Sequence, residues 1–344
     1  MDEKKEIKIP VTILSGFLGA GKTTFLNHLL QENEGTRYAI IENEFGKEGI
    51  DNELIVRPDT TIVELNNGCL CCTLNDNLYD ILNELFERRE EFDELIIEAT
   101  GVADPRGLAQ PFIAHPLIKQ HFPLAAIICL VDAVLVEEQL EQTEEAICQI
   151  TFSDVLLINK IDLVSDEQVA ALENRLQQLH PLATIVKGHK DHFPKMETHK
   201  NREKLEDVFF QSHQRMELPA EQWSFPVQKP HTPHEHKHTA QVKSHAFKFD
   251  QPFDFQILYQ YLFVYFAFQS MGLYRMKGLV WLKNEDKPYV LQSVGKRLNF
   301  YEKRPGRSTE QKQSVLVFIG KNLQRQGLER MFNKCFSTMS LQAK

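Results

Sequence analysis

The chain has 344 residues, of which 42% are hydrophobic and 25% are charged, so it is long enough for two globular domains with buried cores. Its 39 basic and 48 acidic residues give a net charge of −9, which argues against a general nucleic-acid-binding protein. The charged start lacks a signal-peptide core, and the most apolar stretch, Leu262 to Phe268, is too short to cross a bilayer. We therefore expect a cytoplasmic protein that binds neither nucleic acid nor membrane.

The first part of the chain, from Ile9 to about Lys187, alternates strand-like and helix-like segments. Several strand candidates are continuous apolar runs, which is typical of strands buried on both faces. The strand candidates cover residues 11–15, 38–42, 61–65, 94–99, 125–131, 154–159 and 183–187, and clear helical patterns cover 24–32, 77–91 and 166–179. This alternation predicts an α/β domain over residues 1–188, with a mostly parallel sheet and helices on both sides.

The alternation ends at about residue 188. Residues 189–240 are polar, and nine of the 13 histidines fall between His189 and His245, so we interpret this stretch as a linker or exposed insertion. The remaining segments predict a smaller α+β domain over residues 241–344. The expected strands there cover residues 242–249, 278–283, 289–294, 297–303 and 314–320, and the expected helices cover 253–271 and 322–336.

The segment GFLGAGKT, residues 16–23, fits the phosphate-binding pattern G-x-x-x-x-G-K-[ST] between a strand and a helix. Glycines let the loop curl so that its N–H groups point at phosphate oxygens, and the helix N-terminus favours the same anion. Lys22 is expected to reach the β- and γ-phosphates, and the Thr23 hydroxyl to ligate Mg²⁺. The expected nucleotide contacts in this loop are Gly16, Gly19, Ala20, Gly21, Lys22, Thr23 and Thr24.

Two later segments complete a nucleotide site in the expected order. Glu98 ends a buried strand, where a carboxylate can hold a Mg²⁺-bound water, and the N–H of Gly101 can approach the γ-phosphate. The segment Asn159-Lys160-Ile161-Asp162 follows another buried strand. An aspartate there can accept two hydrogen bonds from the guanine edge, which adenine cannot supply, so we expect selection of GTP over ATP.

Three of the six cysteines, Cys69, Cys71 and Cys72, crowd into the loop that we expect after the strand at 61–65. Such spacing favours a metal site in a reducing compartment, and thiolates prefer Zn²⁺ or Cu⁺. Two alternatives are a redox switch and a run of small buried cysteines. Glu42 and Glu44 follow a neighbouring strand, and either carboxylate could complete a site with the thiolates or simply be solvated.

The histidine-rich stretch offers a second, weaker group of metal ligands. We expect its mixture of prolines and lysine to prevent independent folding, and such tracts exchange divalent metal fast. The alternative is a polar linker that happens to contain histidines. The candidate ligands are His231, His234, His236 and His238.

Seven short motifs are spread over the two expected domains: GFLGAGKTT, IENEFG, NNGCLCC, IEATGVADP, NKID, YRMKGLVWL and VFIG. Together they resemble the motifs of the CobW family of metal-handling GTPases. The resemblance implies a P-loop GTPase domain, a CobW-type C-terminal domain and delivery of Zn²⁺, or in some members Co²⁺, to a client protein. It matches Cys69, Cys71, Cys72 and Glu42 with metal ligands. Lys47 stands where the family usually has an acidic residue, and its positively charged side chain could not ligate a metal ion.

The combined interpretation is a GTP-hydrolysing metallochaperone for Zn²⁺, with Co²⁺ as a second candidate, that couples hydrolysis to metal delivery. Lys22, Thr23 and Glu98 are its expected catalytic residues, Mg²⁺ its cofactor, and a client metalloprotein its partner. A nucleotide- or metal-dependent homo-oligomer is a further expectation. The alternative is a metal- or redox-sensing GTPase switch that acts by binding a partner. The eukaryotic members' Cys-Pro docking motif is missing from the start of this chain, so we do not expect that docking partner.

Overall fold

The computed structural model of the chain describes residues 7–33, 35–42, 61–64, 70–189, 192–193, 242–268, 270–294, 297–302 and 313–342. The chain divides into two units, one formed by Met1–Gln177 with Leu182–Phe210 and the other by Gln178–Pro181 with Gln211–Lys344. Most of residues 189–240 lie outside the described ranges, so the domain limits expected from the sequence stay a prediction.

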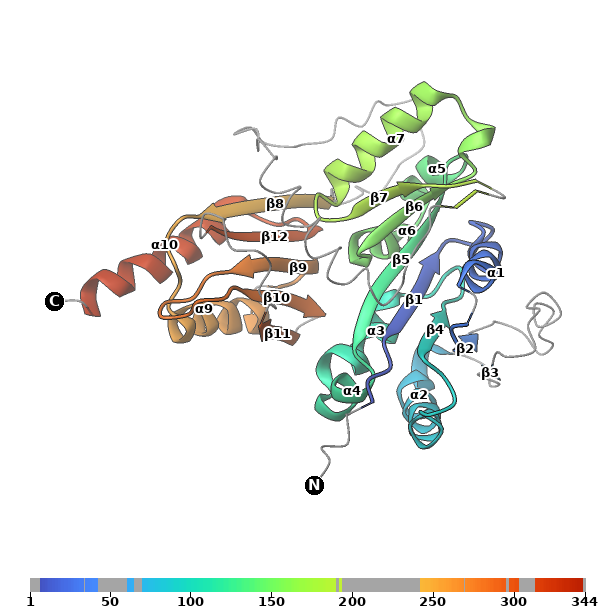
Figure 1. The fold of residues 1–344 in the computed structure, drawn as a ribbon. Helices are drawn as coiled ribbons and strands as arrows, with labels where there is room; N and C mark the ends of the chain where they lie inside the picture. The colour runs from blue at the N-terminus through green and yellow to red at the C-terminus, as the bar shows by residue number, and fades with distance from the viewer. Residues whose placement is uncertain are drawn as a thin grey trace. The chain divides into compact units, whose positions relative to one another are not determined.

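The first unit is built on a seven-stranded sheet in which every neighbouring pair of strands is parallel (Figure 1). Its strand order is β3-β2-β4-β1-β5-β6-β7. The strands are β1 (Val11–Gly16), β2 (Tyr38–Glu42), β3 (Thr61–Glu64), β4 (Glu94–Glu98), β5 (Leu124–Asp132), β6 (Val155–Asn159) and β7 (Thr184–Lys187). The carboxyl ends of parallel strands meet at one edge, where such sheets bind ligands.

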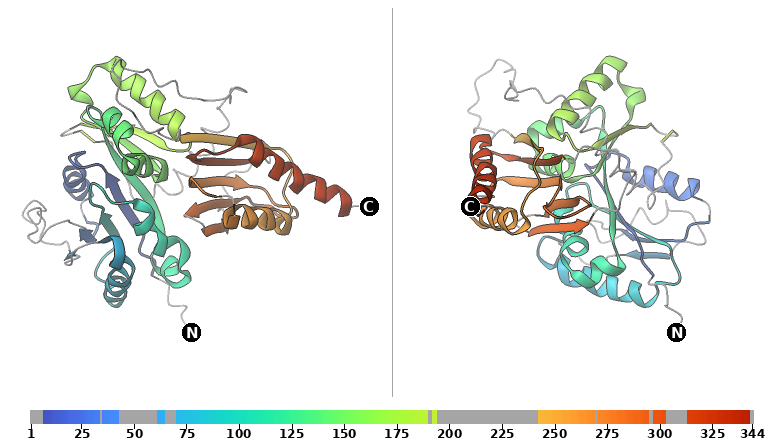
Figure 2. Two further views of the ribbon diagram at one scale, coloured as in Figure 1. Left: turned by 180° about the vertical axis from the view of Figure 1, so that it is seen from behind. Right: turned by 60° about the vertical axis from the view of Figure 1, so that its left-hand side comes forward.

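Helices cover both faces of this sheet, as Figure 2 shows. They are α1 (Lys22–Glu32), α2 (Leu70–Glu87), α3 (Pro105–Ala114), α4 (Pro116–His121), α5 (Val136–Gln142), α6 (Glu144–Phe152) and α7 (Asp166–Leu179), with a short 3₁₀ turn, η2 (Ile161–Leu163). Phe25, Leu26 and Leu29 of α1 pack on one face against Leu14 of β1 and Ile128 of β5. Helices α3 and α6 contact each other and the same two strands. Burial on both faces explains why these strands are continuous apolar runs.

The second unit is a five-stranded antiparallel sheet, ordered β11-β10-β9-β12-β8, with two helices on one face (Figure 2). Its elements are β8 (Val242–Phe249), α9 (Phe255–Phe268), β9 (Leu273–Val280), β10 (Tyr289–Val294), β11 (Arg297–Glu302), β12 (Ser314–Lys321) and α10 (Arg325–Gln342). Leu258 and Leu262 of α9 share one apolar core with Phe318 of β12 and Phe332 of α10. The expected α/β domain followed by a smaller α+β domain is confirmed.

Several element limits differ from the sequence-based expectation. Helix α2 begins at Leu70, so Cys71 and Cys72 lie in its first turn and not in a loop. Strand β9 begins at Leu273 and ends at Val280, whereas we expected residues 278–283, because the preceding YRMK segment pairs with β12. Helix α9 begins only at Phe255, because the Asp254 side chain caps it by accepting from the backbone N–H groups of residues 256 and 257.

Among the residues that the structure describes, no helix is both long enough and apolar enough to cross a membrane.

Candidate functional site

The loop between β1 and α1 has the curled backbone that phosphate binding requires. Gly16, Gly19 and Gly21 have φ angles of 137°, 75° and 96°, which favour glycine. A Cβ on Gly16 would lie 2.5 Å from the Leu130 carbonyl oxygen, and one on Gly21 would lie 2.4 Å from Nδ2 of Asn159. The glycines are therefore needed both for conformation and for space. Helix α1 starts directly after them, so its N-terminal N–H groups open toward the loop.

Lys22 is folded back over this loop. Its Nζ donates hydrogen bonds to the carbonyl oxygens of Gly16 at 3.0 Å and Phe17 at 3.3 Å, and the residue is only 8% exposed. The ammonium group thus lies above the same backbone whose N–H groups would bind phosphate. This placement fits a lysine that neutralises the β- and γ-phosphates of a bound nucleotide.

Thr23 and Glu98 bring two oxygen ligands together from α1 and β4. The Thr23 hydroxyl donates to Oε1 of Glu98 at 2.9 Å. Adjacent ligands of an octahedral Mg²⁺ at about 2.1 Å lie about 3 Å from each other. The pair therefore has a spacing that suits one Mg²⁺ at the end of the phosphate loop.

Gly101 lies against the phosphate loop, at the start of the segment between β4 and α3. A Cβ on Gly101 would come within 2.6 Å of the backbone nitrogen of Leu18. No larger residue could approach the loop as closely. This contact brings the backbone of Gly101 next to Leu18 of the phosphate loop, and its role toward the γ-phosphate stays a prediction.

The NKID segment joins the same site at the end of β6. Asn159 is 4% exposed, and its Nδ2 donates to the carbonyl oxygen of Ala20 at 2.9 Å. Its Oδ1 accepts from the backbone N–H of Lys160, which adopts a left-handed conformation with φ of 61°. Asp162 lies in η2 with an exposed side chain. Asn159 thus holds the phosphate loop, and the exposed carboxylate of Asp162 is accessible to a ligand.

Asp132, at the end of β5, is a site residue that the sequence analysis missed. It is 1% exposed, and its Oδ1 accepts from the backbone N–H groups of Val134 at 2.9 Å and Leu135 at 3.4 Å. Its Oδ2 forms an ion pair with Nζ of Lys160 at 2.6 Å. The carboxylate therefore fixes the lysine of the NKID segment. The sequence signal for this residue was an aspartate at the end of the apolar run of β5. Its partner, Lys160, lies 28 residues later in the chain, so their contact is visible only in the folded structure.

The candidate metal ligands lie largely outside the described residues. Cys69 and the histidines at 231, 234, 236 and 238 are not described, and only the backbone positions of Glu42, Cys71 and Cys72 are. Among the described side chains, no group of three His, Cys, Asp or Glu residues could hold a metal ion. The candidate zinc ligands are therefore placed only by their backbone elements.

The backbone register nevertheless places Glu42 beside the nucleotide site. Glu42 pairs in register with Glu98 of β4 on one side and with Glu64 of β3 on the other. Neighbouring strands are about 4.8 Å apart, so the Cα atoms of Glu42 and Glu98 are one strand spacing apart. Glu98 is the carboxylate that accepts from Thr23. A metal ligand at position 42 would therefore adjoin the expected Mg²⁺ site.

The two folded units each match a family model. The model described as "CobW/HypB/UreG, nucleotide-binding domain" matches residues 10–187, and the model described as "Cobalamin synthesis protein cobW C-terminal domain" matches residues 242–336.

Relatives are known in bacteria and in fungi. The chain is 32% identical over 331 residues to the zinc chaperone YjiA of Escherichia coli, across 94% of this chain and 98% of that protein. It is 36% identical over 186 residues to the zinc-regulated GTPase metalloprotein activator 1 of Schizosaccharomyces pombe, across 52% of this chain and 45% of that protein.

A solved structure agrees with these matches. The crystal structure of the Zn(II)-bound YjiA GTPase from E. coli superimposes with a TM-score of 0.67 and 27% identity, across 95% of this chain and 99% of that chain. Both domains, in the same order, are thus shared with that protein. The chain belongs to the CobW family of metal-handling P-loop GTPases.

Proposed function

We propose that this GTPase is a metallochaperone that binds Zn²⁺ at Cys69, Cys71 and Cys72 with Glu42, and that GTP binding and hydrolysis control delivery of the ion to a client metalloprotein. The main support for the proposal is that Glu42 pairs in register with Glu98 on the neighbouring strand. Glu98 in turn accepts a hydrogen bond from Thr23 of the nucleotide site. The names of the bacterial and fungal relatives support zinc as the ion. Three thiolates also favour Zn²⁺, and Co²⁺ is the second candidate.

In this proposal, the residues of the nucleotide site have separate roles in binding and hydrolysing GTP. Lys22 would neutralise the β- and γ-phosphates, and Thr23 with Glu98 would hold the Mg²⁺ that offsets the charge developing on them. The N–H of Gly101 would contact the γ-phosphate. Asp162 would bind the guanine edge while Asn159 holds the loop. Gly19, Ala20, Gly21 and Thr24 would supply backbone and hydroxyl contacts to the phosphates.

The metal half of the proposal depends on the start of helix α2. Cys71 and Cys72 are the second and third residues of this helix, which starts at Leu70. The N-terminal turn of a helix carries partial positive charge, which stabilises an anionic thiolate. Strand β3, which precedes the cysteine segment, pairs with β2, which ends at Glu42. Zinc bound by both segments would therefore tie α2 to the strand that adjoins β4 and Glu98.

The coupling between zinc and nucleotide is the direct test of this function. We expect the zinc dissociation constant, measured against a chromophoric chelator, to differ by at least about tenfold between GDP and a non-hydrolysable GTP analogue, because couplings of this kind are typically 5–150-fold. An ATP analogue is the control and should leave the constant unchanged. After addition of GTP, a metallochaperone should pass zinc to the chelator as hydrolysis proceeds.

Two results would contradict the proposal in different ways. Equal zinc affinity with GDP and with the GTP analogue would remove the coupling. Coupling without zinc release on hydrolysis would favour the alternative, a metal-sensing switch that acts by binding a partner.

The position of the zinc site can be tested by labelling cysteines in the folded protein. Burial raises the pKa of the thiols of Cys129 and Cys335 to about 12 and that of Cys148 to about 11. At pH 8 these three are at most about 0.1% thiolate, and the thiolate is the reactive form. Iodoacetamide should therefore modify Cys69, Cys71 and Cys72 first, and Zn²⁺ should protect them. Mass spectrometry of tryptic peptides with and without Zn²⁺ measures this difference.

Labelling of the three buried cysteines serves as the internal control, since Zn²⁺ should not change it. If Zn²⁺ left the labelling of residues 69–72 unchanged, the metal would bind elsewhere on the chain. The histidine-rich stretch would then become the leading candidate.

A further inference from the structure

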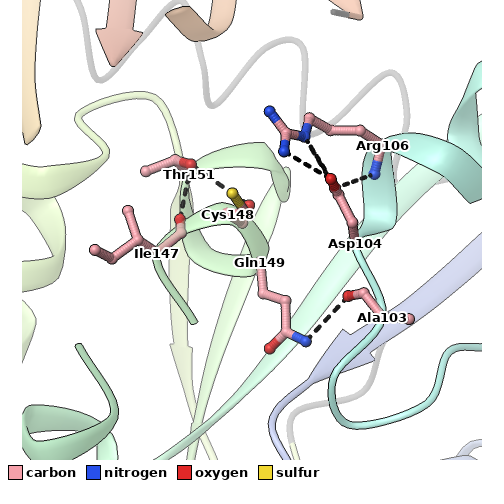
Figure 3. A network of polar contacts seen from close by, with 7 residues as sticks. All are labelled: Ala103, Asp104, Arg106, Ile147, Cys148, Gln149 and Thr151. Carbon is pink, nitrogen blue, oxygen red and sulfur yellow. Dashed lines mark hydrogen bonds and ion pairs between the residues drawn. The ribbon is translucent and has the colours of Figure 1, made fainter. Parts of the chain in front are cut away.

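A glutamine on helix α6 reaches the segment that carries Gly101. Gln149 is 1% exposed, and its Nε2 donates hydrogen bonds to the carbonyl oxygens of Gly101 at 3.1 Å and Ala103 at 3.2 Å. Figure 3 shows the side chain extending from α6 toward Ala103. One buried amide group thus holds two carbonyls of the same short segment.

The segment is held at three further points. The backbone N–H of Ala103 donates to the carbonyl oxygen of Thr100 at 3.0 Å, which closes a turn around Gly101. Gly101 itself lies against Leu18 of the phosphate loop. At the other end, Asp104 caps helix α3 by accepting from the backbone N–H of Arg106 at 2.9 Å, and its carboxylate also binds the Arg106 guanidinium (Figure 3). The turn between β4 and α3 is therefore closely defined.

The geometry gives Gln149 a specific effect on Gly101. A single donor shared by two carbonyls fixes both of their peptide planes relative to α6. The N–H and the carbonyl of residue 101 belong to adjacent peptide planes that share the Cα atom of this residue. Fixing the direction of the carbonyl therefore restricts the direction of the N–H. Without this donor, both carbonyl oxygens would lose this hydrogen-bond partner, which disfavours the present conformation of the turn. The turn would then relax away from its present conformation.

We propose that Gln149 is a positioning residue for γ-phosphate recognition: it holds the 101–103 turn so that the N–H of Gly101 points at the γ-phosphate. The proposal rests on the proposed contact between Gly101 and that phosphate. Because GDP lacks the γ-phosphate, the residue matters for GTP and not for GDP. Gln149 therefore contributes to the protein's discrimination between the two nucleotides, from a helix that carries none of the expected nucleotide contacts.

A purely structural glutamine would behave differently. If Gln149 only satisfied buried carbonyls, its loss would lower the stability of the domain and would weaken GTP and GDP binding alike. A positioning role changes the ratio of the two affinities. The ratio therefore separates the two explanations even when the variant is less stable.

The test compares Gln149→Met with Thr151→Val, both in the presence of Mg²⁺. Methionine keeps the length of the side chain and removes the donor. Thr151 is equally buried on α6, and among the described residues its hydroxyl donates to the carbonyl oxygens of Ile147 and Cys148 in the same helix and to no other group (Figure 3). Dissociation constants for GDP and for a non-hydrolysable GTP analogue are measured by calorimetry. We expect Gln149→Met to lose about tenfold in affinity for the analogue and at most about twofold for GDP, and Thr151→Val to keep the wild-type ratio.

A second substitution covers the case in which Gln149→Met does not fold. Gln149→Glu keeps the shape and places an accepting carboxylate against the two carbonyls, so the same loss of selectivity should appear. An unchanged ratio in either folded variant would overturn the inference while leaving the nucleotide site intact. If the wild-type protein bound neither nucleotide, both the site assignment and this inference would be wrong.

Discussion

Lys22→Ala should reduce the GTPase rate by at least about 100-fold, the effect expected when a charged group that stabilises the transferring phosphate is removed. The side chain lies over the phosphate loop, where its Nζ bonds to the carbonyls of Gly16 and Phe17. It contributes charge to the site and little apolar volume to the core. The melting temperature should therefore change by only a few degrees, since about 1 kcal/mol shifts it by a few degrees in a domain of this size.

The measurement is steady-state phosphate release from GTP, with a melting curve for each variant. Lys8→Ala is a matched control, because Lys8 is an exposed lysine just before β1 and should leave the rate unchanged. Turnover near the wild-type rate in a folded Lys22→Ala protein would refute the assignment of the phosphate loop.

Cys71→Ser should have the second large effect, on zinc. Replacing a thiolate ligand with a hydroxyl should weaken zinc binding by at least about tenfold, the lower end of the losses seen when the ligation of a metal site is disturbed. We also expect Zn²⁺ to raise the GTPase rate of the wild-type protein, because zinc would tie α2 to the strand next to Glu98. The Cys71→Ser protein should keep its basal rate and lose this response.

The measurement is the GTPase rate as a function of free Zn²⁺, together with zinc affinity. Cys148→Ala is the matched control, since Cys148 is a buried cysteine on α6 with a raised thiol pKa. If the Cys71→Ser and wild-type proteins responded to zinc alike, the cysteine segment would not be the regulatory site.

The nucleotide site could be expected from the sequence because its residues are local. The phosphate loop needs three glycines, a lysine and a threonine within eight consecutive residues, and the structure shows those glycines at positive φ angles. Glu98 and Asn159 each close an apolar run, which placed them at the carboxyl ends of strands. Periodicity and turn chemistry are sufficient for features of this kind.

The supporting residues could not be found in this way. Asp132 contacts Lys160, and Gln149 contacts Gly101, across separations of 28 and 48 residues. Nothing in the local sequence of α6 distinguishes Gln149 from a surface glutamine. The start of α2 was missed for a related reason, because cysteine has weak helix propensity and the segment LCCT gave no periodic signal.

The order of the strands has a consequence for how the protein is made. Strand β1 precedes both of its partners in the sheet along the chain, and these partners are β4, which ends at Glu98, and β5, which ends at Asp132. Closing such distant pairs costs loop entropy and slows folding. The phosphate loop is therefore completed only after segments far downstream of it have been translated, since the side chain of Asn159 must be present to bond to the carbonyl oxygen of Ala20. A nascent chain should acquire the ability to bind nucleotide only after β6 has emerged, so nucleotide cannot assist the earlier steps of its folding.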